Sequence, residues 1–157
     1  MNRMGEILAT EFSSQQADFV LTMETKGIPV AFATANALGV PLVIARHSSK
    51  VYEGSAVNIN YVSGSGNIET MSLSRRAVRE KQRALIVDDF LRGGGTARGM
   101  VELMREFSVT VIGMAFVMAT VTPEKKRISG EKSLMTLEVR NGEIPEATVR
   151  PAAWLCE

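Results

Sequence analysis

Four short apolar runs recur along the chain, and segments with helical spacing lie between them. The runs cover residues 17–23, 40–45, 84–89 and 109–120 and are rich in Val, Ile and Leu. Continuous apolar runs of this length are typical of strands that are buried on both faces of a parallel sheet. Residues 28–38 and 97–107 instead carry apolar positions at helical spacing. Strand and helix therefore alternate, which predicts an α/β fold with a mostly parallel central sheet flanked by helices.

Two segments break this alternation. Residues 46–80 are too long for a plain crossover loop, but 55–62 and 68–73 have strand patterns on either side of the turn cluster SGSGN. We therefore expect a β-hairpin excursion that lies over the edge of the sheet. Near the C-terminus, Asn141-Gly142 stands between two apolar-bearing runs and predicts a C-terminal β-hairpin, because Asn-Gly is the commonest two-residue hairpin turn. Residues 3–12 are expected to form a covering helix.

Composition narrows the class of protein. A chain of 157 residues has the size of one domain, so we expect residues 1–157 to form a single unit. Its 18 basic and 17 acidic side chains give a formal net charge of +1, which provides no general attraction to DNA or to an acidic membrane. The single cysteine, Cys156, has no intramolecular partner, and no leader or long apolar run is present. These features predict a cytoplasmic protein with no membrane segment.

An acid pair and a glycine loop form the strongest local motif. Asp88 and Asp89 close the third apolar run, and three glycines, residues 93–95, precede Thr96 and a predicted helix. Ligands of open α/β sheets bind beyond the carboxyl ends of the strands. Backbone N–H groups before a helix suit a phosphate, and two carboxylates suit the hydroxyls of a ribose with Mg²⁺ nearby. The motif predicts a sugar phosphate site, whereas a plain helix cap with a tight turn is the alternative.

A second group of residues supplies positive charge. Lys26 follows the first predicted strand in the turn ETKG, and Arg46 and Lys50 follow the second strand. Charge-assisted hydrogen bonds from such cations are what a pyrophosphate requires. His47, the only histidine, lies among them and is interpreted as a phosphate neighbour or an exposed residue rather than a catalytic base.

The segment ALIVDDFLRGGGT, residues 84–96, resembles the phosphoribosyl pyrophosphate motif of type I phosphoribosyltransferases, and residues 22–50 resemble their pyrophosphate-loop region. The resemblance implies a type I phosphoribosyltransferase-like fold. It implies contacts to the ribose and 5′-phosphate from Asp88, Asp89, Phe90, Leu91, Arg92, Gly93, Gly94, Gly95 and Thr96. It implies contacts to the pyrophosphate from Thr25, Lys26, Gly27, Arg46 and Lys50. The sequence departs from the family at Gly93, where many members have a Thr.

Within that family, the phrases TKGIP, VYEGSAVNINYVSGSGNIETMSL and DDFLRGGGT are similar to the effector domain of purine operon repressors of Gram-positive bacteria. That resemblance implies a homodimer in which phosphoribosyl pyrophosphate, bound with Mg²⁺, acts as an inducer without any transfer reaction. No residue is assigned as a protein ligand of the metal. DNA is expected to be bound only by a separate N-terminal winged-helix domain, which is absent from this chain.

An active purine phosphoribosyltransferase, for adenine or xanthine, is the alternative function. Transfer needs a pocket that recognises a base and a group that manages its proton. The hairpin offers no acid at its turn, with Glu69 lying past it. A packing explanation is available for each of the aromatic residues Tyr52, Phe90, Phe116 and Trp154. Sensing is therefore favoured over catalysis. The basic residues between 75 and 83 fit a solvated surface or a contact with DNA phosphates or an attached domain, and both interpretations stay open.

Overall fold

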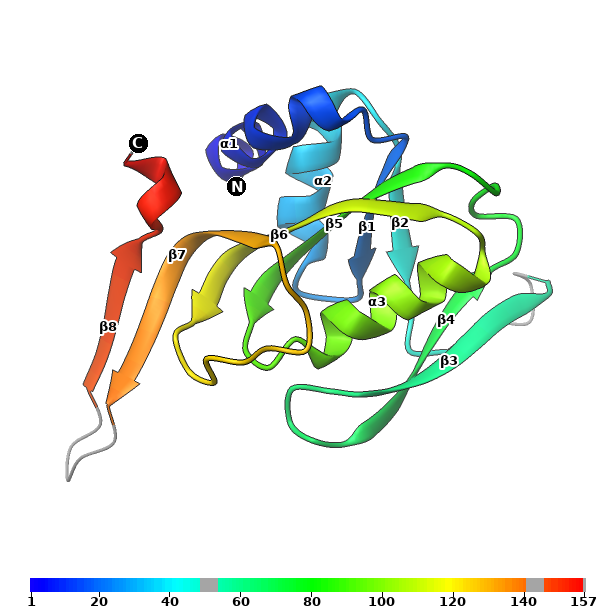
Figure 1. The fold of residues 1–157 in the computed structure, drawn as a ribbon. Helices are drawn as coiled ribbons and strands as arrows, with labels where there is room; N and C mark the ends of the chain where they lie inside the picture. The colour runs from blue at the N-terminus through cyan, green and yellow to red at the C-terminus, as the bar shows by residue number, and fades with distance from the viewer. Residues whose placement is uncertain (49–53, 141–145, 157) are drawn as a thin grey trace.

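The computed structural model describes residues 1–48, 54–140 and 146–156 and contains a six-stranded sheet (Figure 1). Its strands follow the order β2-β1-β5-β6-β7-β8, and all neighbours are parallel except the antiparallel pair β7 and β8. The strands are β1 (Phe19–Met23), β2 (Leu42–Ala45), β5 (Arg83–Leu91), β6 (Thr110–Thr120), β7 (Glu131–Arg140) and β8 (Glu146–Pro151). The mostly parallel sheet and the C-terminal hairpin confirm the fold class expected from the sequence. The turn at Asn141-Gly142 lies outside the described residues.

Helices cover both faces of this sheet. Helices α1 (Asn2–Phe12) and α2 (Ile28–Leu38) pack together on one face, and α3 (Gly95–Glu106) lies on the other (Figure 1). Successive strand residues lie on opposite faces of the sheet. Leu85 belongs to the apolar cluster under α1 and α2, whereas Ile86 belongs to the cluster under α3. This double burial explains why the strands read as continuous apolar runs. Two short 3-10 helices, η1 (Ser13–Gln15) and η3 (Ala153–Leu155), complete the described helices.

Strands β3 (Ala56–Val62) and β4 (Ile68–Ser74) form a separate antiparallel hairpin, as predicted. Its apolar side packs on α3, since Tyr61 and Met71 belong to the same buried cluster as Met100 of that helix. A reciprocal pair of backbone hydrogen bonds between Arg46 and Ser72 also ties β4 to the end of β2. The hairpin therefore adjoins the sheet edge at β2 but rests mainly on α3.

Some boundaries differ from the prediction. The third apolar run was expected to end at Asp89, but β5 continues to Leu91, and α3 begins at Gly95 rather than at Ala97. The strand extends because residues up to Leu91 still pair with β6, with Leu91 opposite Ala119. Among the described helices, none has the length and apolar character needed to cross a membrane.

Candidate functional site

Three loops converge where β1 and β5 end. The turn after β1 spans residues 24–27, the loop after β5 spans 92–94, and the turn of the β3–β4 hairpin spans 63–67. Residues from all three loops line two adjoining cavities, which share five residues: Gly64, Ser65, Asp88, Phe90 and Thr96. The two cavities thus form one continuous site, and it lies at the carboxyl ends of parallel strands as expected.

The first cavity, of about 280 Å³, lies along the glycine loop. Gly94 has a φ of 77°, a left-handed conformation that glycine adopts without steric cost, and it caps the N-terminus of α3. The first amides of a helix have no intrahelical acceptor, so those of α3 are available to an anion. The carbonyl of Gly93 accepts a 2.9 Å hydrogen bond from the Arg127 amide, which fixes the loop from its outer side. This cavity has the donor geometry of a phosphate site.

Asp88 lines both cavities, and the residue is only 9% exposed. Burial, and to a lesser extent the neighbouring Asp89 charge, raises the pKa of Asp88 from 3.8 to about 7, although the Asp89 amide donates a 2.9 Å hydrogen bond to Oδ1 of Asp88, which acts in the opposite direction. Asp89 is half-buried and lines the second cavity. The two acids therefore have different environments, one nearly enclosed and one open to a ligand.

Gly27 lies directly beneath Asp88. A Cβ atom at residue 27 would overlap Oδ1 of Asp88 and would lie 2.5 Å from Oγ1 of Thr22. Thr22 is fully buried, and its hydroxyl has no hydrogen-bond partner in the described part of the chain. The glycine is therefore required for close packing between the turn and the acid, and it contributes no surface to either cavity.

The second cavity, of about 460 Å³, lies along the turn after β1, and Thr25 and Lys26 line it. Both residues are exposed, and the peptide bond between Glu24 and Thr25 is cis. The other predicted cations are placed differently. Arg46 is not among the residues lining this cavity, and its backbone pairs with Ser72, whereas Lys50 lies outside the described residues. Of the cations predicted for the pyrophosphate that the structure describes, Lys26 lines the second cavity and Arg46 does not, while Arg92, predicted for the phosphate, lines the first cavity.

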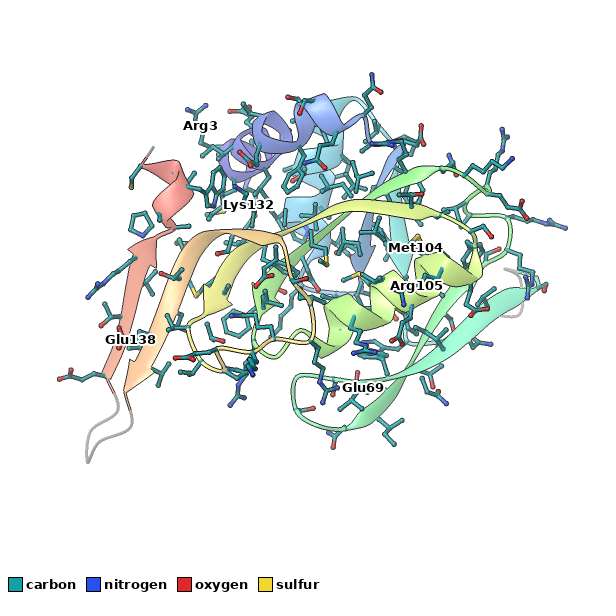
Figure 2. The ribbon with its side chains drawn as sticks, in the orientation of Figure 1. Arg3, Glu69, Met104, Arg105, Lys132 and Glu138 are labelled. Atoms are coloured by element: carbon teal, nitrogen blue, oxygen red, sulfur yellow. The ribbon has the colours of Figure 1, made fainter. Side chains whose placement is uncertain are left out.

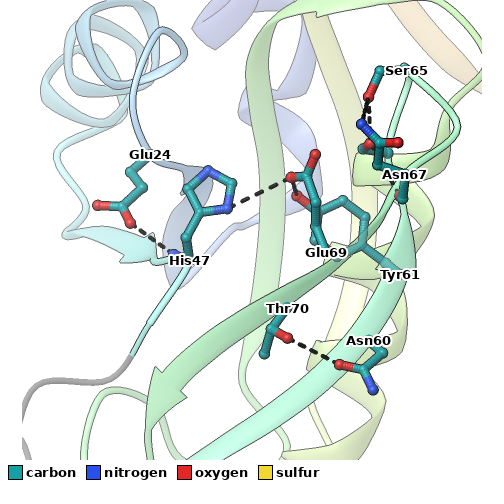
Figure 3. A network of polar contacts seen from close by, with 9 residues as sticks. Glu24, His47, Asn60, Tyr61, Ser65, Asn67, Glu69 and Thr70 are labelled. Carbon is teal, nitrogen blue, oxygen red and sulfur yellow. Dashed lines mark hydrogen bonds and ion pairs between the residues drawn. The ribbon is translucent and has the colours of Figure 1, made fainter.

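A chain of polar contacts joins the hairpin to the loop after β2 (Figure 3). The His47 amide donates to Oε1 of Glu24 at 2.7 Å, and Nδ1 of His47 lies 3.7 Å from Oε2 of Glu69. The Tyr61 hydroxyl donates to the same Glu69 oxygen at 2.9 Å. Burial, followed by the bond to Glu69, raises the pKa of Tyr61 to about 12, and the bond from Tyr61 lowers the pKa of Glu69. These contacts hold the hairpin against the second cavity.

The sequence interpretation missed the role of this pair. Glu69 was set aside because it lies past the hairpin turn, yet the antiparallel register of the hairpin, on which Figure 2 labels Glu69, places this residue directly opposite Tyr61. Both side chains line the second cavity. If the two strands are paired symmetrically about the turn at 63–67, Tyr61 lies opposite Glu69. The contact between them could therefore have been predicted from the strand pattern.

The packing explanation offered for Phe90 is wrong, and Tyr52 lies outside the described residues. The Phe90 side chain is 43% exposed and lines both cavities, as well as a third cavity of about 450 Å³ that it shares with Arg92. Phe116, in contrast, is 1% exposed, and Nε1 of Trp154 donates a 2.7 Å hydrogen bond to the carbonyl of Ser133, so packing accounts for both of those rings. Phe90 is an exposed aromatic face beside the acid pair.

The profile of the phosphoribosyl transferase domain matches residues 2–152. The chain is 42% identical over 142 residues to the purine biosynthesis transcriptional repressor PurR of Bacillus subtilis, covering 90% of this chain and 50% of that protein. It is 40% identical over 139 residues to the purine biosynthesis transcriptional activator PurR of Lactococcus lactis, covering 88% of this chain and 51% of that protein. The chain thus spans about half the length of these regulators.

Enzymes of the same fold are also similar to the chain. A xanthine phosphoribosyltransferase of Geobacillus thermodenitrificans is 39% identical over 119 residues, covering 74% of this chain and 61% of that protein. Among solved structures, an APRTase of Giardia lamblia complexed with 9-deazaadenine superposes with a TM-score of 0.76 at 19% identity, covering 83% of this chain and 75% of that one. The structural likeness confirms the expected type I phosphoribosyltransferase-like fold.

Proposed function

The chain belongs to the phosphoribosyl transferase domain family, and we propose that it is the ligand-sensing half of a purine biosynthesis regulator, with phosphoribosyl pyrophosphate as its effector. The observation that carries the proposal is one continuous site that joins a glycine-loop anion cavity, an acid pair and the Lys26 turn. A sugar carrying phosphate at one end and pyrophosphate at the other presents the groups that these three features complement. The similarity to regulators of purine biosynthesis supports the regulatory setting.

Each part of the ligand has a counterpart in the proposed mode of binding. The 5′-phosphate accepts hydrogen bonds from the loop around Gly94 and from Thr96 at the start of α3. The ribose hydroxyls donate to Asp88 and Asp89. The pyrophosphate lies along Thr25 and Lys26, where a cation is available.

Magnesium fits this mode as a partner of the ligand. Among the described residues, no group of three His, Cys, Asp or Glu side chains is arranged to hold a metal ion. Mg²⁺ commonly keeps several waters and binds through substrate phosphates with few protein ligands. The ion would offset the charge of the pyrophosphate while Lys26 supplies the protein cation.

Ligand identity is tested by isothermal titration calorimetry in the presence of Mg²⁺. Phosphoribosyl pyrophosphate should bind more tightly than ribose 5-phosphate. K26A should reduce the difference in affinity between these two ligands, whereas K125A, at another exposed lysine, should leave that difference unchanged. D88A/D89A should abolish binding of both ligands while circular dichroism remains native. Equal affinity for both ligands in the wild type would rule out the role given to the Lys26 turn.

Purine phosphoribosyl transfer is the second candidate function, and the exposed ring of Phe90 beside the acid pair favours it, because a base could stack there. The similarity to a xanthine phosphoribosyltransferase adds support. A coupled assay of nucleotide formation from adenine, guanine, hypoxanthine and xanthine separates the two functions. Sensing predicts no product, and turnover of any base at an ordinary enzymatic rate, about 1 s⁻¹ or above, would establish the enzyme.

The remaining features of the proposal follow from the regulator setting. We place the protein in the cytoplasm as a homodimer, with sequence-specific DNA recognition assigned to a separate domain. Repression and activation both occur among the similar regulators, so the direction of the response has to be measured. Light scattering coupled to size-exclusion chromatography tests the dimer.

A further inference from the structure

Positive charge is concentrated in residues 75–83, which run from the end of β4 to the first residue of β5, and we call this segment the cationic loop. It contains Arg75, Arg76, Arg79, Lys81 and Arg83, with Glu80 as its acidic member. The whole chain has a formal net charge of only +1, so the charge is localised rather than general. The loop joins the start of β5, whereas the candidate site lies at the opposite, carboxyl end of that strand (Figure 1).

Backbone hydrogen bonds fix the cationic loop along its length. The Arg75 amide donates to the carbonyl of Ser55 at 3.0 Å, and the Lys81 amide donates to the carbonyl of Ser108 at 2.9 Å. The Arg79 amide donates to Oε1 of Gln82 at 2.7 Å. Val78 is 7% exposed and anchors the middle of the loop in the apolar core under α3. The loop therefore holds its cations on a fixed backbone, which limits the entropy lost when they bind a partner.

The basic side chains divide into one structural residue and four available ones. Arg83 donates through Nε and Nη2 to the carbonyl of Gln15, at 3.2 and 2.8 Å, so it serves the fold. The other four are exposed and form no ion pair with any residue that the structure describes: Arg75, Arg76, Arg79 and Lys81. Other exposed cations do form ion pairs, since Nε of Arg98 lies 2.8 Å from Oε1 of Glu102. Four unpaired cations on an ordered loop form a surface for a polyanion.

We propose that the cationic loop contacts the phosphate backbone of duplex DNA. DNA presents phosphates at regular short intervals, so cations spread along a loop can each meet one, whereas a small anion needs cations that converge on a cavity. None of the four cations lines a cavity of the candidate site. The inference rests on the proposed regulatory function, since it places DNA beside the sensing half and lets this half add affinity without reading bases.

The test uses the 157-residue chain, a labelled duplex of arbitrary sequence and no phosphoribosyl pyrophosphate, with binding followed by fluorescence anisotropy across a salt series. The wild type should bind weakly, with a steep salt dependence. R75A/R76A/R79A/K81A should lower the affinity at low salt by about tenfold or more and flatten the slope of log K against log salt by about 3–4, since each lost phosphate contact contributes about 0.9. Thermal melts should confirm that the variant folds.

The control, R3A/R98A/K125A/R150A, removes the same charge from exposed positions elsewhere. It should retain most of the affinity and the slope. Equal losses in the two variants would show that only net charge matters and would overturn the proposal, as would unchanged binding in the loop variant or no DNA binding by the wild type. Because the assay contains no effector, failure of phosphoribosyl pyrophosphate to bind in calorimetry would remove the proposed ligand and leave this result standing.

Discussion

Gly27 and Asp88 are packed so closely that the turn after β1 and the acid of β5 cannot move independently. The space that a Cβ atom at residue 27 would need is taken by Oδ1 of Asp88 and by the hydroxyl of Thr22. Gly27 and Asp88 are both buried; Gly27 lies in the turn after β1, Asp88 lies in β5, and these two strands are parallel neighbours. A ligand that contacts Lys26 in the turn would therefore act on a segment that packs directly against Asp88.

Gly27→Ala should weaken binding of phosphoribosyl pyrophosphate by about tenfold or more, because misplacement by about 1 Å of groups that act together has effects of that order. Titration calorimetry measures the affinity directly. The substitution should also lower the free energy of unfolding by about 1–3 kcal/mol, as overpacking of a filled site does. A variant with wild-type affinity would show that the turn and the acid are not coupled.

Gly5→Ala is the matched control for that experiment. A Cβ atom at residue 5 would lie 2.5 Å from the carbonyl carbon of Ala33, so the substitution disrupts the contact between α1 and α2. It should cost a similar amount of stability, about 1–3 kcal/mol in urea unfolding, for the same steric reason. Neither residue lines the candidate site, so ligand affinity should be unchanged at temperatures where the variant is folded.

The raised pKa of Asp88 predicts how stability depends on pH. The Asp88 carboxyl has a pKa of about 7 in the folded state and about 3.8 in the unfolded chain, so the unfolded chain releases this proton at a lower pH. The free energy of unfolding therefore falls as pH rises from about 4 to 7. Asp88→Asn removes this penalty. Its free energy of unfolding, relative to the wild type, should increase over that range by an amount on the order of 1–4 kcal/mol and stay level above it. A difference independent of pH in urea titrations would contradict the shift.

Ionisation of Asp88 should strengthen ligand binding, although it lowers the stability of the fold. Ribose hydroxyls donate to a carboxylate, so the proposed ligand favours ionised Asp88 and should bind more tightly as pH rises through 7. Calorimetry at pH 6.5 in buffers of different ionisation enthalpy should reveal proton release on binding. D88N should abolish that release, and proton uptake in the wild type would contradict the assignment.

The contacts of Glu69 predict the local stability of the β3–β4 hairpin. Glu69→Ala removes the acceptor of Tyr61 and the neighbour of His47, so amides of β3 and β4 should exchange with solvent about fivefold faster, for a loss of about 1 kcal/mol. Saturating ligand should slow exchange in the wild-type hairpin. Thr70→Val is the matched control, because it removes an exposed hydrogen bond to Asn60 on the same strand pair. Equal exchange rates in both variants would show that the contacts of Glu69 stabilise the hairpin no more than the exposed hydrogen bond of Thr70 does.

Sequence patterns predicted the helices and the central strands, because the burial of these elements leaves a clear pattern of apolar residues. Val20 and Leu21 are both fully buried because they face different helices, and such strands appear in the sequence as continuous apolar runs. Boundaries were harder to predict where pairing overrides local chemistry. Phe90 and Leu91 were expected to lie in the loop after the strand, yet they pair with Met118 and Ala119 of β6 and so extend β5.

The site was predicted where it depends on position along one strand and missed where it depends on pairing between distant segments. Asp88 and the glycine loop were found because strand ends and glycines are visible locally. Arg46 was predicted to contact the ligand, but its place in the sequence beside His47 did not reveal that its backbone pairs with Ser72 of the hairpin or that the residue does not line the second cavity. The closeness of Gly27 to Asp88 likewise depends on the lateral packing of β1 against β5, which no local pattern encodes.

Gly93 offers a gain-of-affinity test of the proposal that the first cavity binds the 5′-phosphate. Nothing lies within 4 Å of a Cβ atom built at this position, and the residue is half-buried in the lining of the cavity. Many type I phosphoribosyltransferases have a Thr here, so Gly93→Thr should be accommodated and should add a hydroxyl donor to the 5′-phosphate. Hydrogen bonds to charged groups contribute about 1.5–3 kcal/mol, so ribose 5-phosphate should bind about tenfold more tightly or better in calorimetry. Gly93→Val has the same shape without the hydroxyl, and it should show no gain. If both variants bind alike, the extra hydroxyl does not reach a phosphate, and the 5′-phosphate does not lie in this cavity.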